Sequence, residues 1–138
     1  MSPKETLAAW NRQLDSARGG MLAGGGKPGV SSLEQLAGKP AGDAKLLSGE
    51  LPFPYMAETM DFALVEVAHG LAVFQSTPQL KHFNPLGTVH GGWFATLLDS
   101  ALGCAVHTTL PAGSGFTTAQ LNIHMVRAAT LKTGRCGP

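Results

Sequence analysis

The feature that most constrains this fold is an apolar stretch of helical periodicity that begins at a His-Gly-Gly triplet. Between His90 and Leu110 the apolar residues recur at every third or fourth position, which predicts one helix over residues 90–110. Pro111 and Gly113 follow and close it. So wide an apolar stripe needs other elements to cover it, and the flanking segments should supply them. The stripe consists of Phe94, Leu97, Leu98, Ala101, Leu102, Ala105 and Val106.

Alternating residues predict strands on both sides of this helix. Before it, the pattern from Met60 to Phe74 predicts a hairpin that turns at His69-Gly70. After it, residues 116–127 alternate between an apolar and a polar row, which predicts a strand with one face in the core. A stable sheet usually needs three or more well-packed strands. We therefore expect the sheet of this chain to be incomplete.

The first 51 residues are expected to form an extension to a single domain over residues 52–138. Leu7, Trp10 and Leu14 lie at helical spacing, and a Gly-rich stretch follows them. Pro52 and Pro54 mark the end of the extension. The expected elements are helices over 5–17, 33–36 and 44–51 and a mobile Gly-rich linker over 19–32.

Composition and charge exclude several classes of function. The net charge is +1 and no basic block occurs, so nucleic acid is not an expected partner. No apolar run is long enough to span a bilayer, and Cys104 and Cys136 do not form a disulfide framework, so a cytoplasmic protein is expected. His82, His107 and His124 show no ligand spacing with a carboxylate, so no metal is expected.

The start of the predicted helix has the residues expected of an acyl-transfer site. The first N–H groups of a helix have no partner within it and bind anions or a developing oxyanion, and Gly91 and Gly92 leave them accessible. Asp99 lies about two and a half turns further on, as a candidate base or nucleophile. Asn84 and His90 offer groups that hold a water molecule or orient a carbonyl.

Each of these residues also has a structural interpretation. The two glycines would serve close packing, Asp99 would be a structural carboxylate, and His90 would be a hydrogen-bonded core histidine. Beside the apolar stripe runs a row of small and polar residues that permits a ligand or another backbone to approach closely. This row consists of Gly92, Thr96, Asp99 and Gly103.

The stretch NPLGTVHGGWFATLLDSALGCAVHTTLPAGSGFTTAQLNIHMVR resembles the phenylacetate-degradation-type (PaaI-like) acyl-CoA thioesterases of the hotdog superfamily. In that family an Asn precedes His-Gly-Gly by six residues, and an Asp lies nine residues after the His. Asn84, His90 and Asp99 meet these positions, and the resemblance covers about residues 52–133. It implies an α+β hotdog fold, in which an antiparallel sheet wraps around one long central helix.

The resemblance also implies roles for single residues. The backbone N–H of Gly91 would hold the thioester carbonyl oxygen, and Asp99 would activate water or attack the carbonyl carbon. Asn84 and His90 would position the carbonyl and the water, and Thr118 would hold the water or the carboxylate. The residues that would contact the substrate are Gly92, Thr96 and Thr117. The substrate would be an aryl- or medium-chain acyl-CoA, with coenzyme A as part of the substrate and no other cofactor.

In that family the site lies between two subunits, so a homodimer or homotetramer is implied. The sequence departs from the family at Arg127-Ala128, where an Arg-Pro pair is usual, and it ends before two further long strands. A truncated C-terminus is therefore expected. This leaves a second hypothesis: an inactive or non-catalytic hotdog domain that binds acyl-CoA or acts as an oligomer partner.

Overall fold

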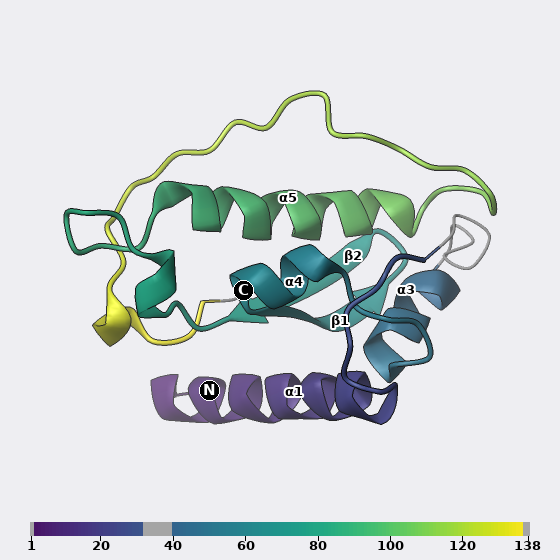
Figure 1. Cartoon of the computed structure of the whole chain (residues 1–138), viewed down its shortest axis with the longest axis horizontal. Helices are drawn as coiled ribbons and strands as arrows, with labels where there is room; N and C mark the ends of the chain where they lie inside the picture. Colours follow the sequence, from purple (N-terminus) through teal and green to yellow (C-terminus); the bar gives the residue numbers. More distant parts are fainter. Residues whose placement is uncertain (1, 32–39, 137–138) are drawn as a thin grey trace.

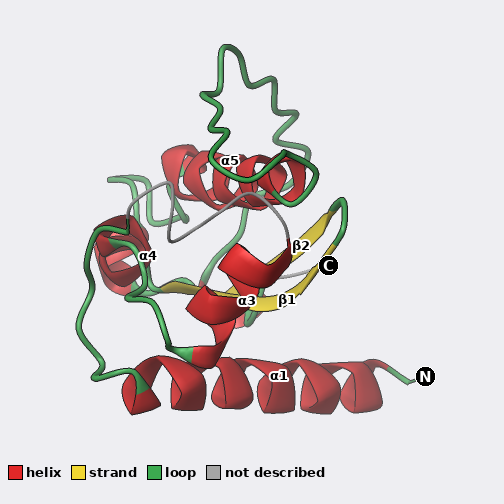
Figure 2. Ribbon diagram, turned by 90° about the vertical axis from the view of Figure 1, so that its right-hand side faces the viewer, coloured by secondary structure: helices red, strands yellow, loops and turns green. Residues whose placement is uncertain are grey.

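A computed structural model of the chain describes residues 2–31 and 40–136. Figures 1 and 2 show a hairpin between two long helices, with the shorter helices at its side. The helix predicted over 33–36 lies outside the described residues. The elements are α1 (Pro3–Ala23), α3 (Pro40–Ser48), α4 (Tyr55–Met60), β1 (Phe62–Ala68), β2 (Leu71–Ser76) and α5 (Gly91–His107), with short 3₁₀ turns at Leu80–His82 and Leu131–Thr133.

The predicted hairpin is confirmed. β1 and β2 pair antiparallel from Phe62↔Ser76 to Ala68↔Leu71, with a register irregularity between Leu64 and Glu66. Gly70 takes a φ of +72° at the turn, which glycine adopts without the strain that a Cβ brings. The first four residues of β1 are buried, because α5 covers one face of the hairpin and α1 the other (Figure 2).

The long helix is also confirmed, and with it the α+β class of an antiparallel sheet packed against one long helix. Trp93 is 2% exposed and belongs to a core cluster with Phe62 and Leu97. Its indole Nε1 donates a hydrogen bond of 2.9 Å to the Met60 carbonyl, so the one polar atom of the buried ring is satisfied. This contact fixes the first turns of α5 against the end of α4.

The apolar stripe of α5 is only partly covered. Leu98, Leu102 and Val106 are 43%, 57% and 49% exposed, although the sequence pattern placed them with the core residues. A two-stranded hairpin is narrower than the stripe, and within the described ranges no further strand lies beside it. One edge of the stripe therefore faces solvent.

The prediction of a strand over residues 116–127 is wrong. The segment runs back along α5 on the side away from the hairpin (Figure 1), and its backbone belongs to no sheet in the described part of the chain. Because α5 stands between it and both strands, its N–H and C=O groups cannot reach a β partner. Met125, which belongs to the apolar row expected in the core, is 53% exposed.

The prediction of a mobile linker over residues 19–32 is wrong for residues 19–23, which belong to α1. Instead of ending before the first glycine pair, α1 continues through it to Ala23, because tertiary packing overrides the low helix propensity of glycine. A Cβ on Gly20 would lie 2.5 Å from the Leu47 carbonyl oxygen, and one on Gly24 would lie 1.9 Å from the Gly49 carbonyl oxygen. These glycines therefore permit close contact between α1 and the end of α3.

Candidate functional site

The start of α5 is fixed by the segments that precede and follow it. The backbone N–H of His90 donates to the His82 carbonyl at 2.8 Å, and that of Val89 donates to the Ala129 carbonyl at 2.9 Å. The His90 side chain then caps the helix, because its Nδ1 accepts the N–H of Gly92 at 2.9 Å. Because Nδ1 accepts this hydrogen bond, the proton of the neutral imidazole lies on Nε2. The His90 side chain is exposed.

Because of this cap, the backbone N–H groups of the two glycines of the triplet differ in their hydrogen bonding. The Gly92 N–H is engaged by His90, whereas the Gly91 N–H meets no acceptor among the described residues. A Cβ on Gly91 would lie 3.6 Å from the terminal methyl group of Met125, an ordinary contact. Of the two, Gly91 is thus the amide that remains for a ligand at the positive end of the helix dipole.

Asn84 organises the loop before the helix. Its Oδ1 accepts the N–H groups of Leu86 and Thr88 at 3.0 and 3.2 Å, and its Nδ2 donates to the Thr88 hydroxyl at 2.9 Å. An asparagine side chain that bonds its own turn in this way fixes the loop conformation. Because Nδ2 carries two hydrogens, a substrate contact at Asn84 and this structural role are compatible.

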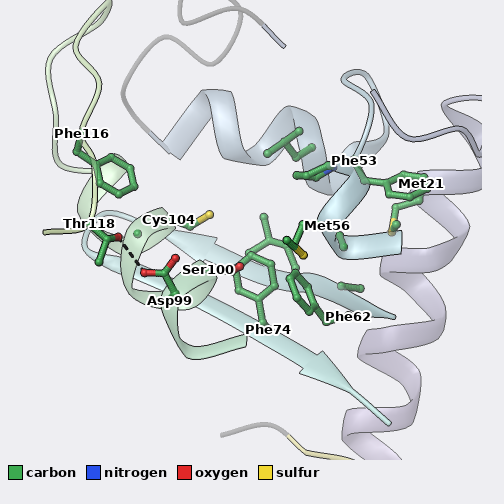
Figure 3. A pocket seen from close by; sticks show the side chains of 16 residues that line it. Met21, Phe53, Met56, Phe62, Phe74, Asp99, Ser100, Cys104, Phe116 and Thr118 are labelled. Atoms are coloured by element: carbon green, nitrogen blue, oxygen red, sulfur yellow. Dashed lines mark hydrogen bonds between the residues drawn. The ribbon is translucent and has the colours of Figure 1, made fainter. Parts of the chain in front are cut away.

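Asp99 and Thr118 meet halfway along α5. The Thr118 hydroxyl donates a hydrogen bond of 2.8 Å to Oδ1 of Asp99 (Figure 3). Asp99 is half-buried and Thr118 is exposed, so the pair lies at an opening rather than inside the core. The second carboxylate oxygen, Oδ2, can accept a hydrogen bond from water.

An apolar cavity of about 210 Å³ begins at this pair and extends between α5 and the hairpin. Figure 3 shows Asp99, Thr118 and Phe116 at one end and Met21 and Phe53 at the other. A carboxylate at the mouth of an apolar cavity is the arrangement expected for a polar reaction on an apolar substrate. The remaining wall is built from Leu46, Pro54, Met56, Ala57, Phe62, Ala63, Leu64, Phe74, Ser100, Gly103 and Cys104.

Phe116 covers Gly103 at the mouth of the cavity. A Cβ on Gly103 would lie 2.8 Å from the Phe116 ring, so only glycine lets the ring approach this closely. The ring is still 45% exposed, which makes it a wall between the cavity and solvent. Gly103 thus has a packing role, in keeping with the row of small residues on this helix.

The structure brings the predicted catalytic residues together in two separate groups. Asn84, His90 and Gly91 lie at the start of α5. Asp99, with Thr118 beside it, lies eight residues or about 12 Å further along the helix. Within one chain, the Gly91 amide and the Asp99 carboxylate are therefore too far apart to contact the same substrate group.

The three residues predicted to contact the substrate do not line the cavity. Gly92 and Thr117 are exposed. The Thr96 hydroxyl donates to the Gly92 carbonyl at 2.9 Å, one turn back along the helix. In a single chain these residues shape the surface of α5 and its first turn rather than the apolar cavity.

Sequence reasoning missed the wall that the N-terminal extension contributes. Met21 of α1 and Leu46 of α3 line the cavity, although the predicted site residues included none from the extension. The signal was present in the spacing, since Leu14, Ala17 and Met21 continue the apolar face of α1 past the glycine pair.

His82 supports the start of α5. Its buried ring lies 5.6 Å from the Trp93 ring and accepts the Gln79 N–H on Nδ1 at 3.0 Å. Burial, with the nearby Lys81 cation, holds the pKa of His82 below its usual value. The ring is therefore neutral at pH 7, as its role as a hydrogen-bond acceptor requires.

Neither a metal site nor a membrane span is found in the described residues. No group of three or more histidine, cysteine, aspartate or glutamate side chains is arranged to hold a metal ion in residues 2–31 and 40–136. Over the same ranges, no helix combines the length and the apolar character that crossing a membrane demands.

Comparison with known proteins gives one match. No curated protein matches the chain. No solved structure matches it either. Residues 86–135, which include the start of α5, Asp99 and Thr118, match the family model of the thioesterase superfamily, so over this part the chain is similar to the hotdog thioesterases.

Proposed function

We propose that this chain is a thioester hydrolase that cleaves an acyl-CoA to a free acid and coenzyme A. The observation that carries the proposal is the Asp99–Thr118 pair at the mouth of an apolar cavity, inside the segment that matches the thioesterase superfamily. The cavity would take the acyl group, and the pair would face the thioester carbon. The phenylacetate-degradation type is the subfamily that the sequence motif favours.

In this reaction Asp99 removes a proton from water while the water oxygen bonds to the thioester carbon. The carbonyl oxygen becomes an oxyanion, and the Gly91 N–H at the start of a helix stabilises it. The C–S bond then breaks as the carbonyl re-forms, and the thiolate of coenzyme A takes the proton that Asp99 removed from water, which restores the carboxylate. Thr118 keeps the carboxylate oriented toward the water, and His90 and Asn84 hold the carbonyl side.

A second copy of the chain would supply the missing half of this site. Gly91 and Asp99 are about 12 Å apart along one rigid helix, too far to act on the same carbonyl group. Two α5 helices side by side and antiparallel would bring the Gly91 of one chain to the Asp99 of the other. The exposed row Leu98, Leu102 and Val106 gives α5 an apolar surface for such a contact.

The test is the release of free thiol from aryl- and straight-chain acyl-CoAs. Replacing Asp99 by Asn keeps the shape and the Thr118 hydrogen bond but removes the base, so kcat should fall by roughly 10²-fold or more. Asp15→Asn makes the same substitution at an exposed residue of α1 outside the cavity, so it is the matched control and should leave kcat within about threefold. Hydrolysis at equal rates by Asp99→Asn and wild type would overturn the proposed mechanism, and binding without hydrolysis would favour a non-catalytic acyl-CoA-binding domain.

A further inference from the structure

We infer that the N-terminal extension sets the length of the acyl group, with Met21 as the residue that ends the cavity. The inference rests on the proposed function, because it assumes that the cavity next to Asp99 holds an acyl chain. Met21 comes from α1 and Leu46 from α3, so both parts of the extension contribute to the cavity wall. Figure 3 shows Met21 beside Phe53, at the end opposite to Asp99 and Thr118.

α1 packs on the hairpin firmly enough to act as a fixed wall. Leu14 and Ala17 are almost fully buried and pack on Ala63 and Val65 of β1. Met21 lies at the border of this cluster. Its side chain therefore extends from a helix that cannot shift without opening the core.

Polar contacts flank this packing. The side-chain amide of Gln75 on β2 donates to Gln13 at 2.9 Å. The Arg18 guanidinium pairs with Asp61, just before β1, at 3.1 Å. Because both contacts require α1 in one register, they hold the position of Met21 along the hairpin.

A third set of contacts fixes α1 to the rest of the extension. The backbones of Gly20 and Gly49 approach so closely that a Cβ on Gly49 would lie 1.9 Å from the Gly20 oxygen. Beyond the helix, the Gly29 N–H donates to the Phe53 carbonyl at 2.9 Å, which ties the chain to a residue of the cavity wall. These contacts keep the extension in place at the end of the cavity opposite to Asp99.

The chemistry of the end wall suits the tail of an acyl chain. Met21, Leu46 and Phe53 present no charged group. The terminal carbons of the acyl chain would therefore be buried against apolar side chains and removed from water, which is favourable. A methionine fills such a position with a flexible, unbranched side chain, and its volume decides how many carbons fit in front of it. The carbonyl end of the chain would then lie at Asp99.

The experiment compares acyl-CoAs of increasing chain length in wild type and three variants. Met21→Ala lengthens the cavity and should raise the ratio of kcat/KM for long over short chains by about 10-fold, while Met21→Trp should lower it by about as much. Leu22→Ala is the matched control, because Leu22 is the next residue of α1 and is 71% exposed. Its ratio should equal that of wild type.

Binding provides a second readout that does not depend on hydrolysis. Thioether analogues of the same acyl-CoAs cannot be cleaved, and their dissociation constants should show the same shift with chain length in the Met21 variants. Wild-type hydrolysis with an unchanged chain-length profile in both Met21 variants would overturn this inference and leave the proposed function standing. A shifted binding profile without hydrolysis would support the inference and overturn the proposed enzymatic activity. Absence of both hydrolysis and binding would overturn both.

Discussion

At the scale of single residues, Gly91 offers the sharpest test of the oxyanion site. It is the first residue of α5, the position where proline is best tolerated, and His90 before it has the extended backbone that proline requires of its neighbour. Gly91→Pro should therefore fold normally yet lose the N–H donor, so kcat should fall roughly 10²–10³-fold. Gly91→Ala keeps the N–H and meets only an ordinary contact with Met125, so its kcat should fall much less than that of Gly91→Pro. Equal rates for the proline variant and wild type would contradict the role of this amide.

His82 makes a prediction about pH at the same scale. Its pKa is lowered in the folded chain, so protons bind the unfolded chain more strongly, and stability falls as pH drops from about 6.5 through the folded pKa. Protonation of Nδ1 would also break the hydrogen bond from the Gln79 N–H. Thermal unfolding between pH 7.5 and pH 5 should show this loss in wild type and a smaller one in His82→Gln. A melting temperature that depends on pH equally in both chains would contradict the assignment.

At the scale of elements, the contact between α1 and the end of α3 predicts that alanine destabilises the chain much more at Gly49 than at Gly113. Gly49 and Gly113 have nearly the same φ, +81° and +79°, so alanine brings similar backbone strain to each. Only at Gly49 would the new Cβ meet backbone, at 1.9 Å from the Gly20 oxygen, whereas nothing lies within 4 Å at Gly113. Gly49→Ala should therefore destabilise the chain by about 2 kcal/mol more than Gly113→Ala in urea unfolding. Equal losses would show that the extension does not pack as described.

The elements also show what the sequence allowed us to predict. The hairpin and α5 depend on local patterns: alternation, the turn glycine and a 3.6-residue period, and both were predicted correctly. In residues 116–127, apolar and polar residues alternate as in a regular strand. A strand also needs a neighbouring strand to pair with, and the alternation does not indicate where that neighbour lies. The continuation of α1 through Gly20 was missed for the same reason, because the close contact that requires a glycine there comes from the Leu47 carbonyl of α3. At the site, the motif pointed to Asp99 and Thr118, which a hydrogen bond joins, while the cavity wall from Met21 depended on tertiary packing.

At the scale of the whole molecule, the separation of the two groups of site residues leads to a prediction about mixed subunits. If the Gly91 of one chain serves the Asp99 of another, a dimer of one Gly91→Pro chain and one Asp99→Asn chain contains one site with both defects and one intact site. Such a dimer should regain about half of the wild-type activity, although each variant alone is nearly inactive. Co-expression with two different tags and purification over both isolates this mixed species.

The mixed dimer separates a shared site from a site within one chain. Were both groups to act on the same thioester within a single chain, every chain of the mixed species would carry a defect, and thiol release would stay at the level of the single variants. A dimer of two Asp99→Asn chains with the same tags gives the baseline, and a dimer of one Asp99→Asn chain with one wild-type chain should also show about half activity. Because α5 is one continuous helix of 17 residues, no bend within it brings Gly91 to Asp99, and recovered activity would therefore require the second chain.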